Sequence, residues 1–127
     1  MPNYGFPQSK RLLKPEDFRK VFTNSAYKVY CSGFVFLATP NNLSSPRLGF
    51  VMAKKNIKLA VQRNKYKRLL RESFRLNQHS LPGIDIVVLA LKSCQETTPL
   101  NLVPSLTPAW LKLSKQANKA AKQSFST

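Results

Sequence analysis

The feature of the sequence that most constrains the fold is an eight-residue run, IDIVVLAL, at residues 84–91. A single acid interrupts this apolar run, and the dipeptide Pro82-Gly83 stops the chain just before it. A run of this kind is typical of a strand in the middle of a sheet. A second run, FVFLA at residues 34–38, also reads as a strand covered on both faces. The chain is therefore expected to fold around a sheet with buried inner strands.

Weaker signals place the elements of the first half of the chain. A helix is expected over residues 15–24, because a proline and two acids at its start suit the first turn of a helix. The first strand is expected within residues 27–38 and a loop over residues 39–46. Residues 47–52 should form the next strand, antiparallel to the first, and residues 54–58 a basic connector.

Two more helices are expected after the connector. Residues 59–78 contain no Gly or Pro and mostly favour helix, which makes this the longest predicted helix. A C-terminal helix is expected over about residues 109–122, with Thr107-Pro108 at its start. Pro99 and Pro104 oppose a regular helix that begins earlier.

The length and charge of the chain indicate one nucleic-acid-binding domain. At 127 residues it fits a single RNA-binding domain over residues 1–127, with an ordered core at about 8–121 and a disordered tail at 123–127. The net charge is +16, from 21 Lys and Arg against 5 Asp and Glu, while 43% of residues are hydrophobic. A folded domain with this charge indicates a polyanionic partner, foremost nucleic acid. Without a membrane span or a signal peptide, a cytoplasmic location and no membrane partner are expected.

Side chains that could carry catalysis or hold a metal are sparse. The five acids are scattered, which argues against the carboxylate cluster of a two-metal nuclease. Cys31 and Cys94 lack the paired spacing of a zinc or redox site and are expected to be buried, and His79 stands alone. We therefore expect no catalytic residue, no metal site and no cofactor bound by the protein alone.

The helix predicted at residues 59–78 carries its cations in a single stripe. At about 100° per residue, six positions fall within an arc of roughly 100°: Ala60, Asn64, Lys67, Arg68, Arg71 and Arg75. An apolar set on the other side is expected to be buried: Tyr66, Leu69, Leu70, Phe74 and Leu76. A solvated helix usually mixes charges to gain i,i+4 pairs, whereas Glu72 is the only acid here. Arginine suits bidentate phosphate contacts and Asn64 suits a 2′-hydroxyl or a base edge, so the stripe favours RNA.

A motif on the same helix points to a known family. Its core reads R-N-x-x-K-R-x-x-R-E and is carried by Arg63, Asn64, Lys67, Arg68, Arg71 and Glu72. Three flanking segments follow the family's order: RLLKPEDFRKVF at residues 11–22, PRLG at 46–49 and LPGIDIVV at 81–88. Over about residues 6–92 the chain resembles the bacterial ribonuclease P protein family. An ordered set of segments is more specific than a basic helix alone.

The resemblance implies the accessory protein of an endoribonuclease holoenzyme. Such a protein binds the catalytic RNA of ribonuclease P and precursor tRNA, and assists removal of the 5′ leader to give the mature tRNA end. The RNA carries the chemistry, and the RNA-containing holoenzyme uses Mg²⁺. DNA is not an expected partner. The residues expected to bind the catalytic RNA are Lys54, Lys55, Arg63, Asn64, Lys65, Lys67, Arg68, Arg71 and Arg75.

The resemblance also implies a cleft between the first helix and the sheet that receives the single-stranded leader. The residues expected to line this leader cleft are Phe18, Phe22, Val35 and Leu37. Spacing alone favours a core role for the two aromatic residues, and only the resemblance assigns them to the leader, on whose bases they could stack. Because neighbours on a strand point to opposite faces, Phe34 and Phe36 should then pack inside.

The fold that the resemblance implies is an α/β (α+β) two-layer sandwich, similar to the second domain of ribosomal protein S5. Helices pack on a central, mostly antiparallel sheet, and a left-handed β-α-β crossover carries the basic helix. Physical reasoning alone favours a right-handed connection. This sequence departs from the family at Lys65, usually an arginine, and at Lys58, often a glycine. The C-terminal prolines predict a helix that begins late.

Two other classes share part of these features. A structural RNA-binding protein of the ribosomal type would have the same charge and arginine stripe but no role in tRNA processing. A DNA-binding domain could lay the same helix in a major groove. Neither class accounts for the ordered flanking segments.

Overall fold

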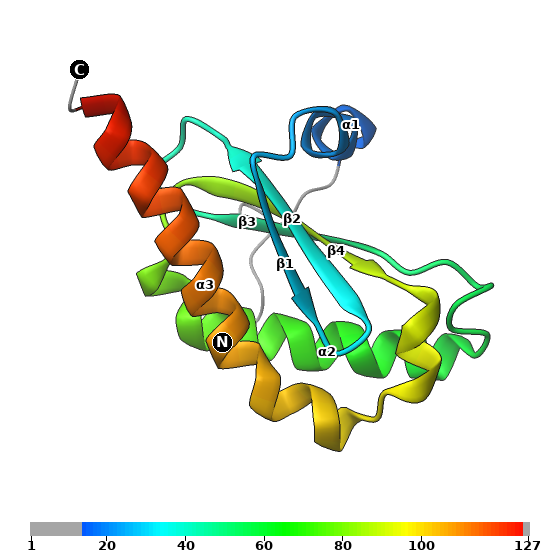
Figure 1. The fold of residues 1–127 in the computed structure, drawn as a ribbon. Coiled ribbons are helices and arrows are strands. Elements are labelled where there is room, and N and C mark those ends of the chain that lie inside the picture. Colours follow the sequence, from blue (N-terminus) through cyan, green and yellow to red (C-terminus); the bar gives the residue numbers. More distant parts are fainter. Residues whose placement is uncertain (1–13, 126–127) are drawn as a thin grey trace, which may run out of the picture.

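In the computed structural model, residues 14–125 are described, with side chains through residue 119. Within this range, four strands form one sheet, and the chain also contains three α-helices and two short 3-10 helices (Figure 1). In chain order the elements are α1 (Pro15–Thr23), β1 (Tyr27–Cys31), β2 (Phe34–Pro40), β3 (Arg47–Val51), α2 (Ala60–Asn77), η2 (Gln78–Ser80), β4 (Ile84–Ala90), η3 (Lys92–Glu96) and α3 (Pro99–Phe125).

The order of the strands is β1-β2-β4-β3, so β4 is an inner strand, as its apolar run predicts. It pairs antiparallel with β2 and parallel with β3, and β1 pairs antiparallel with β2. The expectation of a mostly antiparallel sheet is therefore confirmed. β3 runs antiparallel to β2, as predicted, but β4 lies between them. The crossover from β3 to β4 contains α2.

The segment at residues 27–38, expected as one strand, is a hairpin. β1 and β2 are joined by Ser32 and Gly33, whose φ angles are 43° and 85°. Both angles are left-handed, as a two-residue type I′ turn requires. A Cβ on Gly33 would lie 2.5 Å from the Cα of Cys94, so close approach also demands glycine here. The Ser-Gly pair is the sequence signal for this turn, but the strongly apolar flanks on both sides obscure it.

Helices cover both faces of the sheet. α2 and α3 lie on one face, and α1 lies across part of the other (Figure 1). On the first face, the rings of Phe36 and Phe74 lie 4.7 Å and 5.7 Å from that of Trp110. On the second face the buried cluster consists of Val21, Val35, Leu37 and Val87. The expected α+β sandwich is confirmed, and so is the parity of β2, with Phe34 and Phe36 on the opposite face from Val35 and Leu37.

The C-terminal helix begins ten residues earlier than predicted, at Pro99 instead of about residue 109, and it includes Pro104 and Pro108. The buried residues of α3 explain why: Leu102, Leu106, Ala109, Trp110, Leu113 and Ala117 recur at helical spacing. An interior proline costs about 3 kcal/mol, whereas each fully buried Leu contributes roughly 1.5–3 kcal/mol. Packing therefore outweighs the prolines.

The ends of the expected ordered core are only partly visible. α3 continues to Phe125, which includes the first part of the segment expected to be a disordered tail. The expected start of the ordered core, residues 8–13, and the last two residues of the tail lie outside the described range.

α2 confirms the helix predicted at residues 59–78, although α3, with 27 residues against 18, is the longer helix. The buried face of α2 is narrower than the predicted one. Tyr66, Leu70 and Phe74 are its buried residues. Leu69 is half-buried and Leu76 is 63% exposed, so the prediction that both belong to the core is wrong. The buried face is centred nearer to Leu70 and Phe74, because α2 packs against both the sheet and the neighbouring α3 and leaves its Leu76 side in solvent.

Candidate nucleic-acid interface

The basic stripe of α2 consists of Asn64, Lys67, Arg68, Arg71 and Arg75, and Arg71 brings it into contact with the edge strand β3. Arg71 holds its guanidinium carbon 5.3 Å from the centroid of the Phe50 ring, within range of a cation–π contact. Lys67 and Arg71 are half-buried, whereas Asn64 and Arg68 are exposed. The stripe therefore has a half-buried side, where Arg71 meets β3, and an exposed side that faces solvent.

Arg63, the first residue of the motif, binds the protein's own backbone. Its Nη1 donates hydrogen bonds to the carbonyl oxygens of Ile57 at 2.7 Å and of Lys58 at 2.9 Å. These bonds fold the end of the basic connector against the first turn of α2. Arg63 therefore positions the connector, in addition to any contact that its remaining N–H groups make with RNA.

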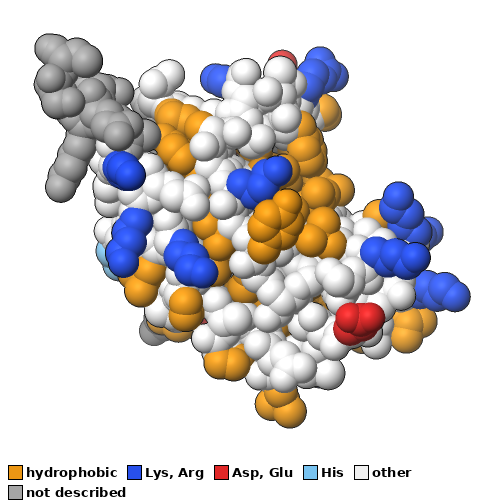
Figure 2. Space-filling model, viewed as in Figure 1, with side chains coloured by type: hydrophobic (Ala, Val, Ile, Leu, Met, Phe, Trp, Pro, Cys, Tyr) orange, Lys and Arg blue, Asp and Glu red, His pale blue; other side chains and the backbone are white. Residues whose placement is uncertain are grey.

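The connector at residues 54–58 is held at two more points. Asn56 donates from Nδ2 to the carbonyl oxygen of Ala90 at 2.8 Å, and Gln95 donates from Nε2 to that of Lys55 at 3.2 Å. Lys54, Lys55 and Lys58 remain exposed. Figure 2 shows Lys and Arg side chains gathered over this end of the molecule. The cations of the connector thus stand on a braced loop next to the start of α2.

Arg75 forms an ion pair within the helix. Its guanidinium donates to the carboxylate of Glu72, with Nε 3.2 Å from Oε2. This hydrogen bond, together with the attraction between the two opposite charges, lowers the pKa of Glu72 and raises that of Arg75. Both side chains are largely in solvent, where such a pair contributes little. Arg75 can therefore leave Glu72 and bind a phosphate with little loss of folding free energy.

The α1 face of the sheet carries the predicted leader-cleft residues, but they are not equally accessible. Phe18 packs against the cluster of Val35 and Leu37, which are only 4% and 8% exposed. Phe22 is 44% exposed, because Val21 is the residue of α1 that turns fully inward. Of the predicted residues, only the two aromatic ones present substantial surface to a ligand.

An accessible cavity lies on the same face of the sheet, beside the part that α1 covers, and the sequence analysis did not predict it. A cavity of about 640 Å³ is lined by Val51, Leu89 and Leu91, with Lys55 and Lys92 beside them. The three apolar residues pack against the cluster beneath α1, so the cavity continues this apolar surface from α1 toward the connector. Their position follows from alternation along β4, since Val87 and Leu89 share a face.

An ion pair between β3 and β4 lies at the opposite end of the α1 face. Arg47 donates from Nε and Nη2 to the two carboxylate oxygens of the buried Asp85, at 2.8 Å and 2.7 Å. Asp17 of α1 lies 3.7 Å from the same Nη2, and Asn41 donates to Asp85 at 2.9 Å. These contacts raise the pKa of Arg47, chiefly through the hydrogen bond to Asp85. Arg47 thus links α1 to the sheet.

Together, the fold and the site define a class of protein. A basic α+β domain that gathers cations along one helix and its preceding connector has the layout of an RNA-binding protein. No helix within residues 14–125 is long and apolar enough to cross a membrane.

Comparisons with known proteins identify the family. The family model described as Ribonuclease P matches residues 6–114. The chain is 44% identical over 119 residues to the ribonuclease P protein component of Chromohalobacter salexigens, covering 94% of this chain and 93% of the relative. It is 49% identical over 113 residues to that of Aliivibrio salmonicida, covering 89% and 96%. The solved RNase P protein of Staphylococcus aureus superposes with a TM-score of 0.69 at 31% identity, covering 79% of this chain and 91% of that one. The chain belongs to the ribonuclease P protein family.

This membership settles the general role. The chain is the accessory protein of an endoribonuclease holoenzyme that acts in tRNA processing, and the catalysis is carried by RNA. Its partner in the holoenzyme is accordingly an RNA. The alternative of a ribosomal-type protein without a role in tRNA processing is not favoured.

Proposed function

We propose that the chain binds the catalytic RNA of ribonuclease P through the basic stripe and the connector. The residues that would make these contacts are Lys54, Lys55, Arg63, Asn64, Lys65, Lys67, Arg68, Arg71 and Arg75. The observation that carries the proposal is that the motif cations follow one flank of α2 directly into the braced connector. A continuous row of this kind matches a phosphate backbone, which has one charge per nucleotide.

The leader of precursor tRNA would lie in the cleft on the α1 face. Phe18 and the exposed Phe22 offer rings for base stacking, with Val35 and Leu37 beneath α1 as the buried support. The cavity beyond α1 extends this apolar floor toward Lys55 and Lys92. A single strand laid along the floor would keep its bases on apolar side chains and bring its phosphates near these ammonium groups.

The protein would act by electrostatics and positioning. Cations that neutralise phosphates replace part of the counterion atmosphere of the RNA, and this lowers the magnesium concentration that the holoenzyme needs. Mg²⁺ would be used by the RNA-containing holoenzyme, without a cofactor on the protein. The assembly would work in the cytoplasm, where precursor tRNA is made and processed.

A binding comparison tests the choice of partner. Equilibrium affinities are measured at several salt concentrations for a bacterial ribonuclease P RNA, a ribosomal RNA fragment of equal length and duplex DNA. We expect the ribonuclease P RNA to bind at least tenfold more tightly than the other two at physiological salt. Equal affinity for the ribosomal fragment would support the ribosomal alternative, and a preference for the duplex would support DNA binding.

A further inference from the structure

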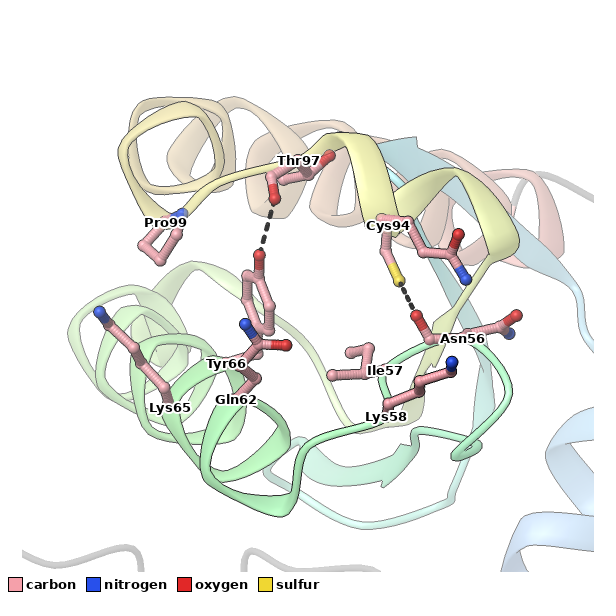
Figure 3. A pocket seen from close by; sticks show the side chains of 10 residues that line it. Asn56, Ile57, Lys58, Gln62, Lys65, Tyr66, Cys94, Thr97 and Pro99 are labelled. Carbon is pink, nitrogen blue, oxygen red and sulfur yellow. Dashed lines mark hydrogen bonds between the residues drawn. The ribbon is translucent and has the colours of Figure 1, made fainter.

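A second cavity, of about 400 Å³, lies between α2 and the segment that leads from η3 into α3 (Figure 3). It opens on a different flank of α2 from the one that meets β3. The lining residues that matter here are Ile57, Lys58, Gln62, Lys65, Tyr66 and Pro99. Its volume is within the range of small-ligand sites, about 300–1,000 Å³.

The walls of this cavity are fixed by internal hydrogen bonds. Tyr66 donates from its hydroxyl to the carbonyl oxygen of Thr97 at 2.9 Å and so ties α2 to the approach to α3 (Figure 3). On the connector side, Asn56 and Gln95 are engaged with backbone carbonyls. Arg63 holds the carbonyl oxygens of Ile57 and Lys58. The cavity is therefore preformed, which reduces the entropy lost when a ligand binds.

Three polar side chains that line the cavity are available to bind a ligand. Within the part of the chain that the structure describes, Lys58, Gln62 and Lys65 make no hydrogen bond or ion pair through their side chains. Two ammonium groups suit a phosphate, and a side-chain amide offers both a donor and an acceptor to a base edge. Ile57, Pro99 and the ring of Tyr66 supply apolar surface for a planar base.

We propose that this cavity receives one unpaired nucleotide of the bound RNA. Its phosphate would lie near Lys58 and Lys65, and its base edge would meet the amide of Gln62. This inference rests on the proposed function, because it adds a subsite to the same RNA interface. It differs from that function in a testable way, since Lys58 and Gln62 lie outside the set of motif residues expected to contact the RNA.

The test compares Gln62→Leu with a matched control, Val61→Ala. Leu keeps the helix propensity and approximate size of Gln62 but removes the amide, whereas Val61 is the next residue, is 71% exposed and does not line the cavity. Binding to a bacterial ribonuclease P RNA is measured together with chemical modification of base edges across that RNA. We expect Gln62→Leu to weaken binding about three- to tenfold and to expose one nucleotide that the wild type and Val61→Ala protect.

A second variant tests the phosphate. Lys58→Gln should make the dependence of log K on log salt shallower by about one, whereas Gln62→Leu should leave it unchanged. If the wild type binds the RNA but Gln62→Leu has the same affinity and the same modification pattern, the nucleotide pocket is refuted and the proposed function stands. If the wild type shows no preference for this RNA, the proposed function fails and the pocket with it. Unchanged thermal melting of each variant confirms that the fold is intact.

Discussion

The ion pair of Arg47 and Asp85 gives the sharpest prediction of stability. The side chain of Asp85 is 4% exposed and accepts three hydrogen bonds, two from Arg47 and one from Asn41. Asp85→Asn keeps the shape but removes the charge, and it places an amide N–H against these donors. Removing one partner of a buried ion pair costs about 3–5 kcal/mol. Since the side chain of Arg47 is 23% exposed and can regain some water, we expect about 3 kcal/mol.

Urea denaturation measures this loss. A small domain loses about 2 kcal/mol of unfolding free energy per molar urea, so the midpoint should fall by about 1.5 M. Asp17→Asn is the control, because it removes only the partly exposed partner 3.7 Å from Arg47 and should cost about 0–1 kcal/mol. If Asp85→Asn costs less than about 1 kcal/mol, or no more than Asp17→Asn, the reasoning that Arg47 and Asp85 hold this end of the sheet is refuted.

Three further predictions address the interface and the fold. Arg68→Ala should weaken RNA binding and make the dependence of log K on log salt shallower by about one, and an unchanged slope would count against a phosphate contact. Phe18→Ala should weaken binding of precursor tRNA more than binding of mature tRNA; equal losses, or simple unfolding, would assign Phe18 to the core, and Phe22→Ala offers the same comparison at an exposed site. Pro108→Ala should raise the free energy of unfolding by about 2 kcal/mol, because it restores an N–H inside α3 and removes a clash, partly offset by a more flexible unfolded chain. A decrease in urea midpoint for Pro108→Ala would mean that the proline fixes a bend that the packing of α3 needs.

The elements with strong local signals could be predicted from the sequence. The apolar run at residues 84–91 gave an inner strand, and the stretch without Gly or Pro gave α2 to within one residue at each end. The placement of β4 between β2 and β3 could not be predicted from periodicity, because strand order depends on contacts between segments distant in sequence. For α3, local propensity was misleading, because Leu102 and Leu106 bury against the core on a helix that two prolines disfavour.

The sequence could predict which types of residue form the site, but not which other residues of the chain each of them contacts. The sequence identified the cations of α2, yet only the structure shows that Arg63 binds the carbonyl oxygens of Ile57 and Lys58 and that Arg71 lies over Phe50. The residues in these contacts are not spaced by the repeat of a helix or of a strand, so periodicity could not predict the contacts. The predicted roles of the stripe and of Phe18 and Phe22 in binding RNA stay predictions. Arg47 was noted as part of a flanking motif, but its pairing with Asp85 needs the parallel register of β3 and β4.

Reconstitution tests the central claim most directly. The purified chain is added to a bacterial ribonuclease P RNA at a magnesium concentration at which the RNA alone cleaves slowly, and the release of the 5′ leader from precursor tRNA is measured. The protein should stimulate cleavage strongly at low magnesium and much less at high magnesium, because its cations replace part of the counterion atmosphere. Failure to stimulate 5′ maturation at low magnesium would contradict the account.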